Sequence, residues 1–204
     1  MKGFITLEGG DGSGKSTLAQ GLKDYFKRSK IDALFTREPG GSKIGEEIRR
    51  ILLSHDYLEM APRTEALLYA ASRAQHVEEV IKPALKAGKL VICERFVLSS
   101  IAYQGYGREL PISQVSSIND FATNGLVPDL VLFIHVNWQE TLRRKITQGG
   151  DRLELSGDSF HKRVYEGYQK IQEEETNKIL IDGSKSPNEV LNHAIEALKE
   201  RGMI

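Results

Sequence analysis

The sequence has one cysteine, few aromatic residues and no long hydrophobic run. With Cys93 as its only cysteine among 204 residues, the chain cannot form an internal disulfide or a cysteine-based zinc site, and we expect a buried strand thiol in a cytoplasmic protein. The apolar run nearest the start, Phe4–Leu7, is too short for the core of a signal peptide, and no stretch approaches the roughly 20 apolar residues of a membrane span. These absences exclude a disulfide scaffold and predict a protein without membrane contact.

The chain also has no excess of charge of either sign. Its 28 lysines and arginines balance its 28 aspartates and glutamates. A protein that wraps long nucleic acid depends on many surplus cations, so we expect no long nucleic acid as a partner, while small anionic ligands stay possible. A chain of this length buries roughly 70% of its unfolded surface on folding, which predicts one domain over 1–204.

Short apolar runs alternate with longer segments of helical spacing along the chain. Strands separated by helices imply a parallel sheet covered on both faces, which is why its strands read as continuous apolar runs. The expected strands are Phe4–Leu7, Leu34–Thr36, Leu90–Cys93, Val131–Val136 and Ile179–Ile181. The clearest expected helices run over Lys15–Arg28, from Phe160 to Ile171 and from Val190 to Leu198. We therefore predict an α/β fold with a five-stranded parallel sheet flanked by helices.

Two helix starts and one loop can also be predicted. Ser186 with Pro187 has the pattern of a cap and first helical turn, and Asn137 with Glu140 that of a capping box. The segment 148–158, QGGDRLELSGD, is rich in glycine and charge, so we expect a mobile loop there.

Charged residues stand at the ends of the predicted strands, where ligands bind in an open parallel sheet. They are Glu8 with Gly9, Arg37 with Glu38 and Glu94 with Arg95, and Asn137 follows the fourth strand. Arg37 and Arg95 offer planar, permanently charged groups, which suit a second phosphate-bearing substrate facing a bound nucleotide.

The segment after the first strand matches the phosphate-binding pattern G-x-x-x-x-G-K-[ST]. It comprises Gly9, Gly10, Asp11, Gly12, Ser13, Gly14, Lys15 and Ser16, with Thr17 next in the expected helix. Glycines let successive N–H groups turn inward, and the helix N-terminus adds partial positive charge, so the loop suits nucleotide phosphates. We expect Lys15 to reach the outer phosphates and the Ser16 hydroxyl to bind Mg²⁺.

A phosphate-binding loop of this kind also needs a second carboxylate, usually at the end of a neighbouring strand. Glu94 ends one apolar run and Asp182 another. We favour Glu94, because Asp182 with Gly183 and Ser184 also reads as ordinary turn chemistry.

Several motifs in one order make the chain similar to the thymidylate kinases. They are FITLEGGDGSGKST (4–17), TREPGG (36–41), LLYAASRAQHV (67–77), ERFVLSSIAYQG (94–105), PDLVLFI (128–134) and DRLE (151–154). The resemblance implies the P-loop nucleoside monophosphate kinase fold. It further implies transfer of the γ-phosphoryl group of ATP to dTMP, giving dTDP and ADP, with Mg²⁺, as part of dTTP synthesis.

The resemblance implies roles for residues at the phosphate and sugar of dTMP. Arg37 and Arg95 would hold its phosphate, and Asp11 would lie near the deoxyribose 3′-hydroxyl and the metal. Tyr103 would pack beside C2′ and disfavour a ribose hydroxyl. Lys15, Glu94 and Arg95 are thereby expected to act in catalysis.

It likewise implies roles at the base. Tyr69 would stack on thymine, Arg73 would hydrogen-bond to it, and Ser100 and Gln104 would line the base end. Two alternatives remain open: Tyr69 and Arg73, four residues apart, as an ordinary pair at the edge of the core, and Gln104 as a surface residue.

The chain departs from the family pattern at two places. Family members usually carry Asp where this chain has Glu94. Some carry a catalytic arginine in the P-loop where this chain has Gly12, so the resemblance implies a catalytic cation from a mobile lid at about 143–157. Its candidates are Arg143, Arg144, Lys145 and Arg152. Arg152, in DRLE, matches best, whereas Arg143 and Arg144 could be the solvated face of a helix.

Three further alternatives stay open. Glu94-Arg95 also fits a deoxynucleoside kinase, in which the carboxylate serves a 5′-hydroxyl acceptor. A nucleotide-driven switch or regulatory ATPase would need no second-substrate pocket. The family forms homodimers through helices, and the alanine- and leucine-rich segment Ala66–Ala74 could serve as that contact or pack internally.

Overall fold

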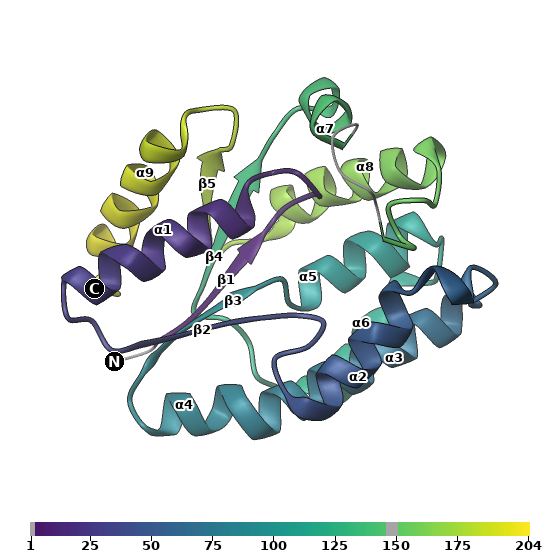
Figure 1. The fold of residues 1–204 in the computed structure, drawn as a ribbon, viewed down its shortest axis with the longest axis horizontal. Coiled ribbons are helices and arrows are strands. Elements are labelled where there is room, and N and C mark those ends of the chain that lie inside the picture. Colours follow the sequence, from purple (N-terminus) through teal and green to yellow (C-terminus); the bar gives the residue numbers. More distant parts are fainter. Residues whose placement is uncertain (1–2, 146–150) are drawn as a thin grey trace.

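Five parallel strands form the central sheet of the computed structural model, within the residues that the structure describes, 3–145 and 151–204 (Figure 1). They are β1 (Phe4–Glu8), β2 (Ala33–Arg37), β3 (Leu90–Glu94), β4 (Leu130–His135) and β5 (Lys178–Asp182), in the order β2-β3-β1-β4-β5. The predicted α/β fold with five parallel strands is confirmed, although Val136 lies beyond the end of β4. The three inner strands are almost wholly buried, which explains their continuous apolar runs.

One face of the sheet is covered by α1 (Lys15–Arg28) and α9 (Pro187–Glu200), which pack against each other (Figure 1). Leu22 and Phe26 of α1 and Leu198 of α9 belong to one buried cluster with the inner strands. The predicted cap of α9 is confirmed, because the Ser186 side chain and Glu189 form a full capping box.

The other face is covered by a second set of helices. They are α3 (Pro62–His76), which continues through a π-helical stretch (Val77–Ile81) into α4 (Lys82–Lys86), then α5 (Val97–Ser100) with its π-helical extension Ile101–Gly107, and α8 (Asp158–Glu174). Of these, α3, α5 and α8 contribute to the site. Two further helices, α2 (Lys43–Leu53) and α6 (Ile112–Thr123), pack on α3. A 3-10 turn, His55–Tyr57, follows α2.

The chain between β4 and α8 carries the predicted lid. Helix α7 (Trp138–Lys145) begins where expected, with the Asn137 side chain accepting a hydrogen bond from Glu140 N at 2.9 Å. The Glu140 carboxylate pairs instead with Arg143 and Arg144. Residues 146–150 of the predicted lid, and with them 148–150 of the predicted loop, lie outside the described part of the chain. The rest of the loop forms turns up to Gly157, and Asp158 already belongs to α8. Among the described residues, no helix is both long and apolar enough to cross a membrane.

Candidate functional site

The loop between β1 and α1 has a backbone that requires glycine. Gly9, Gly12 and Gly14 have φ values of 145°, 72° and 98°, which L side chains rarely adopt. A Cβ at Gly9 would lie only 2.3 Å from the carbonyl oxygen of Ile134, so a side chain there would collide with the end of β4. Helix α1 begins at Lys15; its N-cap residue, Gly14, offers no side-chain cap, and its first turn has no acidic residue. Its first N–H groups therefore stay available to a phosphate.

Lys15 lies folded over this loop. Its Nζ donates to the carbonyl oxygens of Gly9 and Gly10 at 3.0 and 2.6 Å and to Ser13 Oγ at 3.3 Å. Burial, together with the positive charge of Arg95, lowers the pKa of Lys15 to about 7. The amine is thus poised to gain charge beside an anion.

Ser16 and Glu94 meet at the opening of the loop. The Ser16 hydroxyl donates to Glu94 Oε2 at 2.7 Å. Hydroxyl and carboxylate oxygens are ligands that Mg²⁺ prefers, so this pair fits such an ion. Asp182 is occupied differently, because its Oδ1 accepts from the backbone N and the hydroxyl of Ser184 at 2.9 and 2.6 Å. Those bonds are the turn chemistry that the sequence offered as the alternative for Asp182.

A pocket of about 720 Å³ lies beyond the carboxyl ends of the strands, a size typical of small-molecule sites. Most predicted site residues line it: Asp11, Gly12, Gly14, Lys15, Ser16, Thr17, Arg37, Tyr69, Arg73, Glu94, Arg95, Ser100, Tyr103 and Gln104. Among the described residues, the predicted ones outside this lining are Gly9, Gly10, Ser13 and Arg152. The phosphate loop and the predicted acceptor residues therefore share one cavity.

Arg95 is held between Asp11 and Tyr103. Its Nη2 forms a short ion pair with Asp11 Oδ1, and its guanidinium carbon lies 5.1 Å from the centre of the Tyr103 ring. The Tyr103 hydroxyl donates to Asp11 Oδ2 at 2.6 Å. Because both Asp11 oxygens are engaged, Asp11 joins the loop to the acceptor side of the pocket.

A second set of contacts supports Arg95 from behind. Its Nη1 donates to Ser99 Oγ and the Tyr168 hydroxyl, each at 3.1 Å. Glu8, at the end of β1, accepts from Ser99 Oγ at 2.7 Å and from Phe96 N at 2.8 Å. Burial raises the pKa of Glu8. In the sequence, Glu8 is recognisable only as a strand-end residue, and Ser99 and Tyr168 carry no signal, because their bonds to Arg95 depend on packing between β1, α5 and α8.

Arg37 lies at the end of β2 in a two-pronged pair with Glu46 of α2, at 2.8 and 3.1 Å. These bonds lower the pKa of Glu46. Arg49, one turn further along α2, donates to Pro39 O at 2.9 Å and also lines the pocket. The pocket thus has a further, half-buried arginine that the sequence motifs did not indicate.

Arg73 is buried and fixed on every side. Its Nε donates to Glu38 Oε2 at 2.7 Å, its Nη1 to Ser100 Oγ at 2.9 Å and closely to Asn119 Oδ1, and its Nη2 to Phe96 O at 2.8 Å. The guanidinium therefore has one orientation toward the pocket that it lines.

A buried histidine continues this network. His76 Nδ1 lies 3.0 Å from Glu38 Oε1, and its Nε2 lies 2.7 Å from Thr36 Oγ1. Cys93 completes a buried group with Glu38 and His76 whose ligand-type atoms lie within 4.8 Å of one another. Burial raises the pKa of Cys93 well above its usual value, so it remains the buried strand thiol that was predicted. Through Glu38, which contacts both His76 and Arg73, this group helps to hold the Arg73 guanidinium in place.

The base end of the pocket carries Tyr69 and Gln104. Tyr69 is half-buried, and burial raises the pKa of its hydroxyl. Gln104 is 1% exposed, and its Nε2 donates to Glu65 Oε1 at 2.9 Å. The alternative of a surface Gln104 is therefore wrong.

The lid cations take different positions. Arg152 is 3% exposed, with Nε donating to Leu52 O at 2.7 Å and Nη2 lying 2.8 Å from Glu65 Oε2. Arg144 instead lies over the phosphate loop, donating to Gly12 O at 2.9 Å and to Gly183 O at 3.1 Å.

The neighbours of Arg144 lie elsewhere. Arg143 is solvated, as one alternative held, and pairs with Glu140. The side chain of Lys145 lies outside the described part of the structure. Among the described lid cations, Arg144 is therefore the one that touches the loop.

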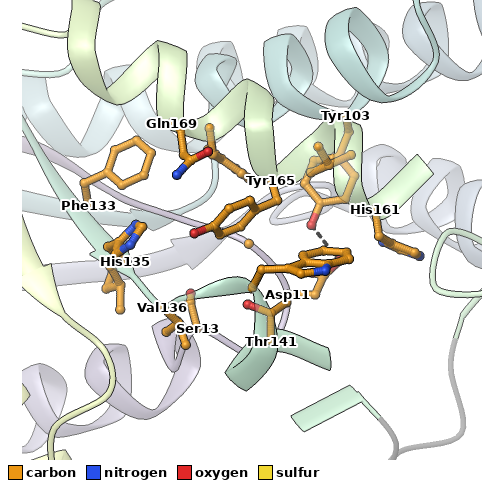
Figure 2. Close-up of a pocket in the computed structure, with 15 residues that line it drawn as sticks. Asp11, Ser13, Tyr103, Phe133, His135, Val136, Thr141, His161, Tyr165 and Gln169 are labelled. Atoms are coloured by element: carbon orange, nitrogen blue, oxygen red, sulfur yellow. Dashed lines mark hydrogen bonds between the residues drawn. The ribbon is translucent and has the colours of Figure 1, made fainter. Parts of the chain in front are cut away.

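A second, much smaller cavity of about 30 Å³ lies where α7 and α8 approach the phosphate loop. Figure 2 shows Tyr165 of α8 over Thr141 of α7, with the hydrogen bond from Tyr103 to Asp11 nearby. It is far smaller than the pocket of about 720 Å³, so the larger pocket is the candidate substrate site.

Comparisons with known proteins agree on one family. A family model described as thymidylate kinase matches residues 7–194. The thymidylate kinase of Finegoldia magna is 52% identical over 202 residues, covering 98% of this chain and 100% of that protein. That of an Exiguobacterium species is 47% identical over 206 residues, covering 98% and 97%. The crystal structure of thymidylate kinase from Ehrlichia chaffeensis matches with a TM-score of 0.79 at 31% identity, covering 96% of this chain and 98% of that one.

Proposed function

The chain belongs to the thymidylate kinase family and is an ATP:dTMP phosphotransferase, and from this premise we propose that it works in the cytoplasm as a Mg²⁺-dependent homodimer. The observation that carries the proposed mechanism is that Lys15 of the phosphate loop and Arg73 of the base end line one pocket. ATP would lie on the loop and dTMP against Arg95, Arg73 and Tyr69.

Catalysis in this pocket is mainly positioning and electrostatic stabilisation, because phosphoryl transfer spreads negative charge over the migrating group. Lys15 would neutralise the outer phosphates of ATP. Arg95, with Arg37, would hold the dTMP phosphate in line with them. Asp11 pairs with Arg95 and would thereby help to position the dTMP phosphate.

We propose that Ser16 and Glu94 hold Mg²⁺, which supplies charge neutralisation on the ATP phosphates. Support comes from the 2.7 Å contact of their oxygens at the open end of the loop. Asp11, the other predicted ligand, would have to share an oxygen that already accepts from Arg95 or Tyr103.

We propose that the homodimer forms through α2, α3 and α6. Over 66–74, Ala66 faces the interior, whereas Leu67 is 57% exposed. Ile44 on α2 and Phe121 on α6 also expose large apolar side chains. Neighbouring exposed apolar side chains are typical of partner surfaces. The segment 66–74 would thus pack one face against the core and the other against a second copy. The sedimentation coefficient of the purified chain tests whether it is a dimer.

A coupled assay that compares dTMP, dUMP, thymidine and no acceptor tests the proposed function. We expect ADP release with dTMP and little with thymidine. Phosphorylation of thymidine but not dTMP would favour a deoxynucleoside kinase, and acceptor-independent ATP hydrolysis would favour a switch or regulatory ATPase.

We expect Arg144→Ala to lower kcat about 10-fold, because it removes the lid cation that contacts the phosphate loop. Arg143→Ala is the matched control, since Arg143 pairs with the same Glu140 but is exposed to solvent. Steady-state kinetics should show kcat within about 2-fold of the unsubstituted protein for Arg143→Ala. A large loss of kcat in Arg152→Ala, with none in Arg144→Ala, would return the catalytic role to Arg152.

We expect ATP binding at pH 8 to take up close to one proton. With the pKa of Lys15 at about 7, roughly nine in ten free molecules carry a neutral amine at that pH. Phosphates favour the charged amine, so binding raises this pKa, and ATP affinity falls as pH rises above about 7. Calorimetry in buffers of different ionisation enthalpy measures the uptake. The same uptake in Lys15→Met would show that another group takes the proton.

A further inference from the structure

Glu65 is a wholly buried carboxylate that contacts three polar side chains, of which Gln104 lines the large pocket. It lies on α3 with 0% exposure. Its oxygens accept from Gln104 Nε2 at 2.9 Å and from Arg108 at 2.9 and 3.2 Å, and Arg152 Nη2 lies 2.8 Å away. A charge buried this deeply is costly unless it is fully paired, so all of these partners hold Glu65 in place.

Glu65 determines which way the Gln104 amide faces. A carboxylate only accepts hydrogen bonds, so the Gln104 atom that it binds must be the nitrogen. Among the described residues no hydrogen bond reaches Gln104 Oε1. Because Gln104 lines the large pocket, Oε1 is presented there as an acceptor.

The base end therefore offers an acceptor from Gln104 and, from Arg73, the one guanidinium N–H that no described residue engages. Thymine has a donor at N3 and an acceptor at O4, which complements this arrangement. Cytosine has the reverse, an acceptor at N3 and an amino donor at C4. A Gln104 amide turned by 180° would present its nitrogen instead and would lose this distinction.

The same carboxylate holds a segment that borders the pocket. Arg152, paired with Glu65, also donates from its backbone N to Leu53 O at 3.3 Å. Its neighbours Asp151 and Leu153 line the pocket. Contact with Glu65 thus positions both the Gln104 amide and the pocket-lining segment next to Arg152.

We propose that Glu65 is the positioning residue that sets the pyrimidine preference of the enzyme, by holding Gln104 with Oε1 toward the base. The inference rests on the proposed function, since it concerns the same acceptor pocket. It gives the Glu65–Arg152 pair a role in substrate choice.

The test is the substrate preference of Glu65→Gln, measured as kcat/KM for dTMP, dUMP and dCMP. An amide at position 65 can donate as well as accept, so Gln104 becomes free to turn. We expect the dTMP/dCMP preference to fall at least about 10-fold. The dTMP/dUMP preference should stay within about 2-fold, because uracil and thymine share the N3 and O4 groups, and the KM for ATP should change little.

Asp129→Asn is the matched control, because Asp129 Oδ2 accepts from Phe4 N at the opposite end of the sheet. It should lower Tm without altering either preference. An unchanged dTMP/dCMP preference in folded Glu65→Gln, or equal changes in both preferences, would overturn the proposal and leave Glu65 a structural role. Failure of the unsubstituted protein to use dTMP would instead reject the proposed function.

A second measurement uses the unsubstituted protein, in case Glu65→Gln does not fold. In NMR spectra with dTMP bound, the Gln104 side-chain N–H₂ signals should stay protected from solvent exchange by Glu65. A nuclear Overhauser contact between the pyrimidine N3–H proton and these amide protons, with loss of protection, would show the nitrogen facing the base and overturn the proposal.

Discussion

Replacing Lys15 with alanine should lower kcat by at least about 10²-fold while the chain stays folded. Lys15 supplies the fixed positive charge of the phosphate loop, and its Nζ is placed by the carbonyl oxygens of Gly9 and Gly10. Since its burial disfavours the charged form, the free protein gains little from that charge, and removing it should cost little stability. Steady-state kinetics with saturating ATP and dTMP, together with a thermal melt, measure both effects.

The matched control is Lys23→Ala, because Lys23 is an exposed lysine on the same helix. It should keep normal turnover. Near-normal turnover in Lys15→Ala would contradict the assignment of Gly9–Ser16 as the ATP phosphate site.

Glu94→Gln should weaken Mg²⁺-dependent turnover on the order of 10²-fold. The substitution keeps a side-chain oxygen that can accept from Ser16 Oγ but removes the negative charge. A phosphate acceptor has a second pKa of about 6 and is already ionised at neutral pH, so the reaction needs no general base. The loss should therefore appear in the Mg²⁺ dependence of kcat, measured by titrating the metal at fixed ATP.

Two variants bracket this result. Glu94→Asp keeps the negative charge but retracts the carboxylate by one methylene, and it should keep substantial activity. Asp182→Asn is the matched carboxylate-to-amide change, and it should leave the Mg²⁺ dependence unaltered because Asp182 serves a turn with Ser184. Equal Mg²⁺ dependence in Glu94→Gln and the unsubstituted protein would move the metal ligand to Asp11 or Asp182.

The sequence by itself determined the sheet and the phosphate loop. Strands buried on both faces must be apolar along their length, so β1, β3 and β4 could be predicted from their continuous apolar runs. The loop was readable because its backbone demands glycine at fixed positions, and the φ values of Gly9, Gly12 and Gly14 show that demand. Both signals are local, since each depends on residues close together in the chain.

The tertiary structure decided which partner each long side chain takes. The sequence favoured Arg152 over Arg144 as the catalytic cation, but Arg152 lies against Glu65, 87 positions earlier in the chain, while Arg144 reaches Gly12. An arginine can extend to any acceptor within its reach, so only the packing of α2, α3 and α7 selects among them. Glu65 itself carried no sequence signal, because a buried carboxylate is distinguished from a surface one only by the cations and amides that folding brings to it.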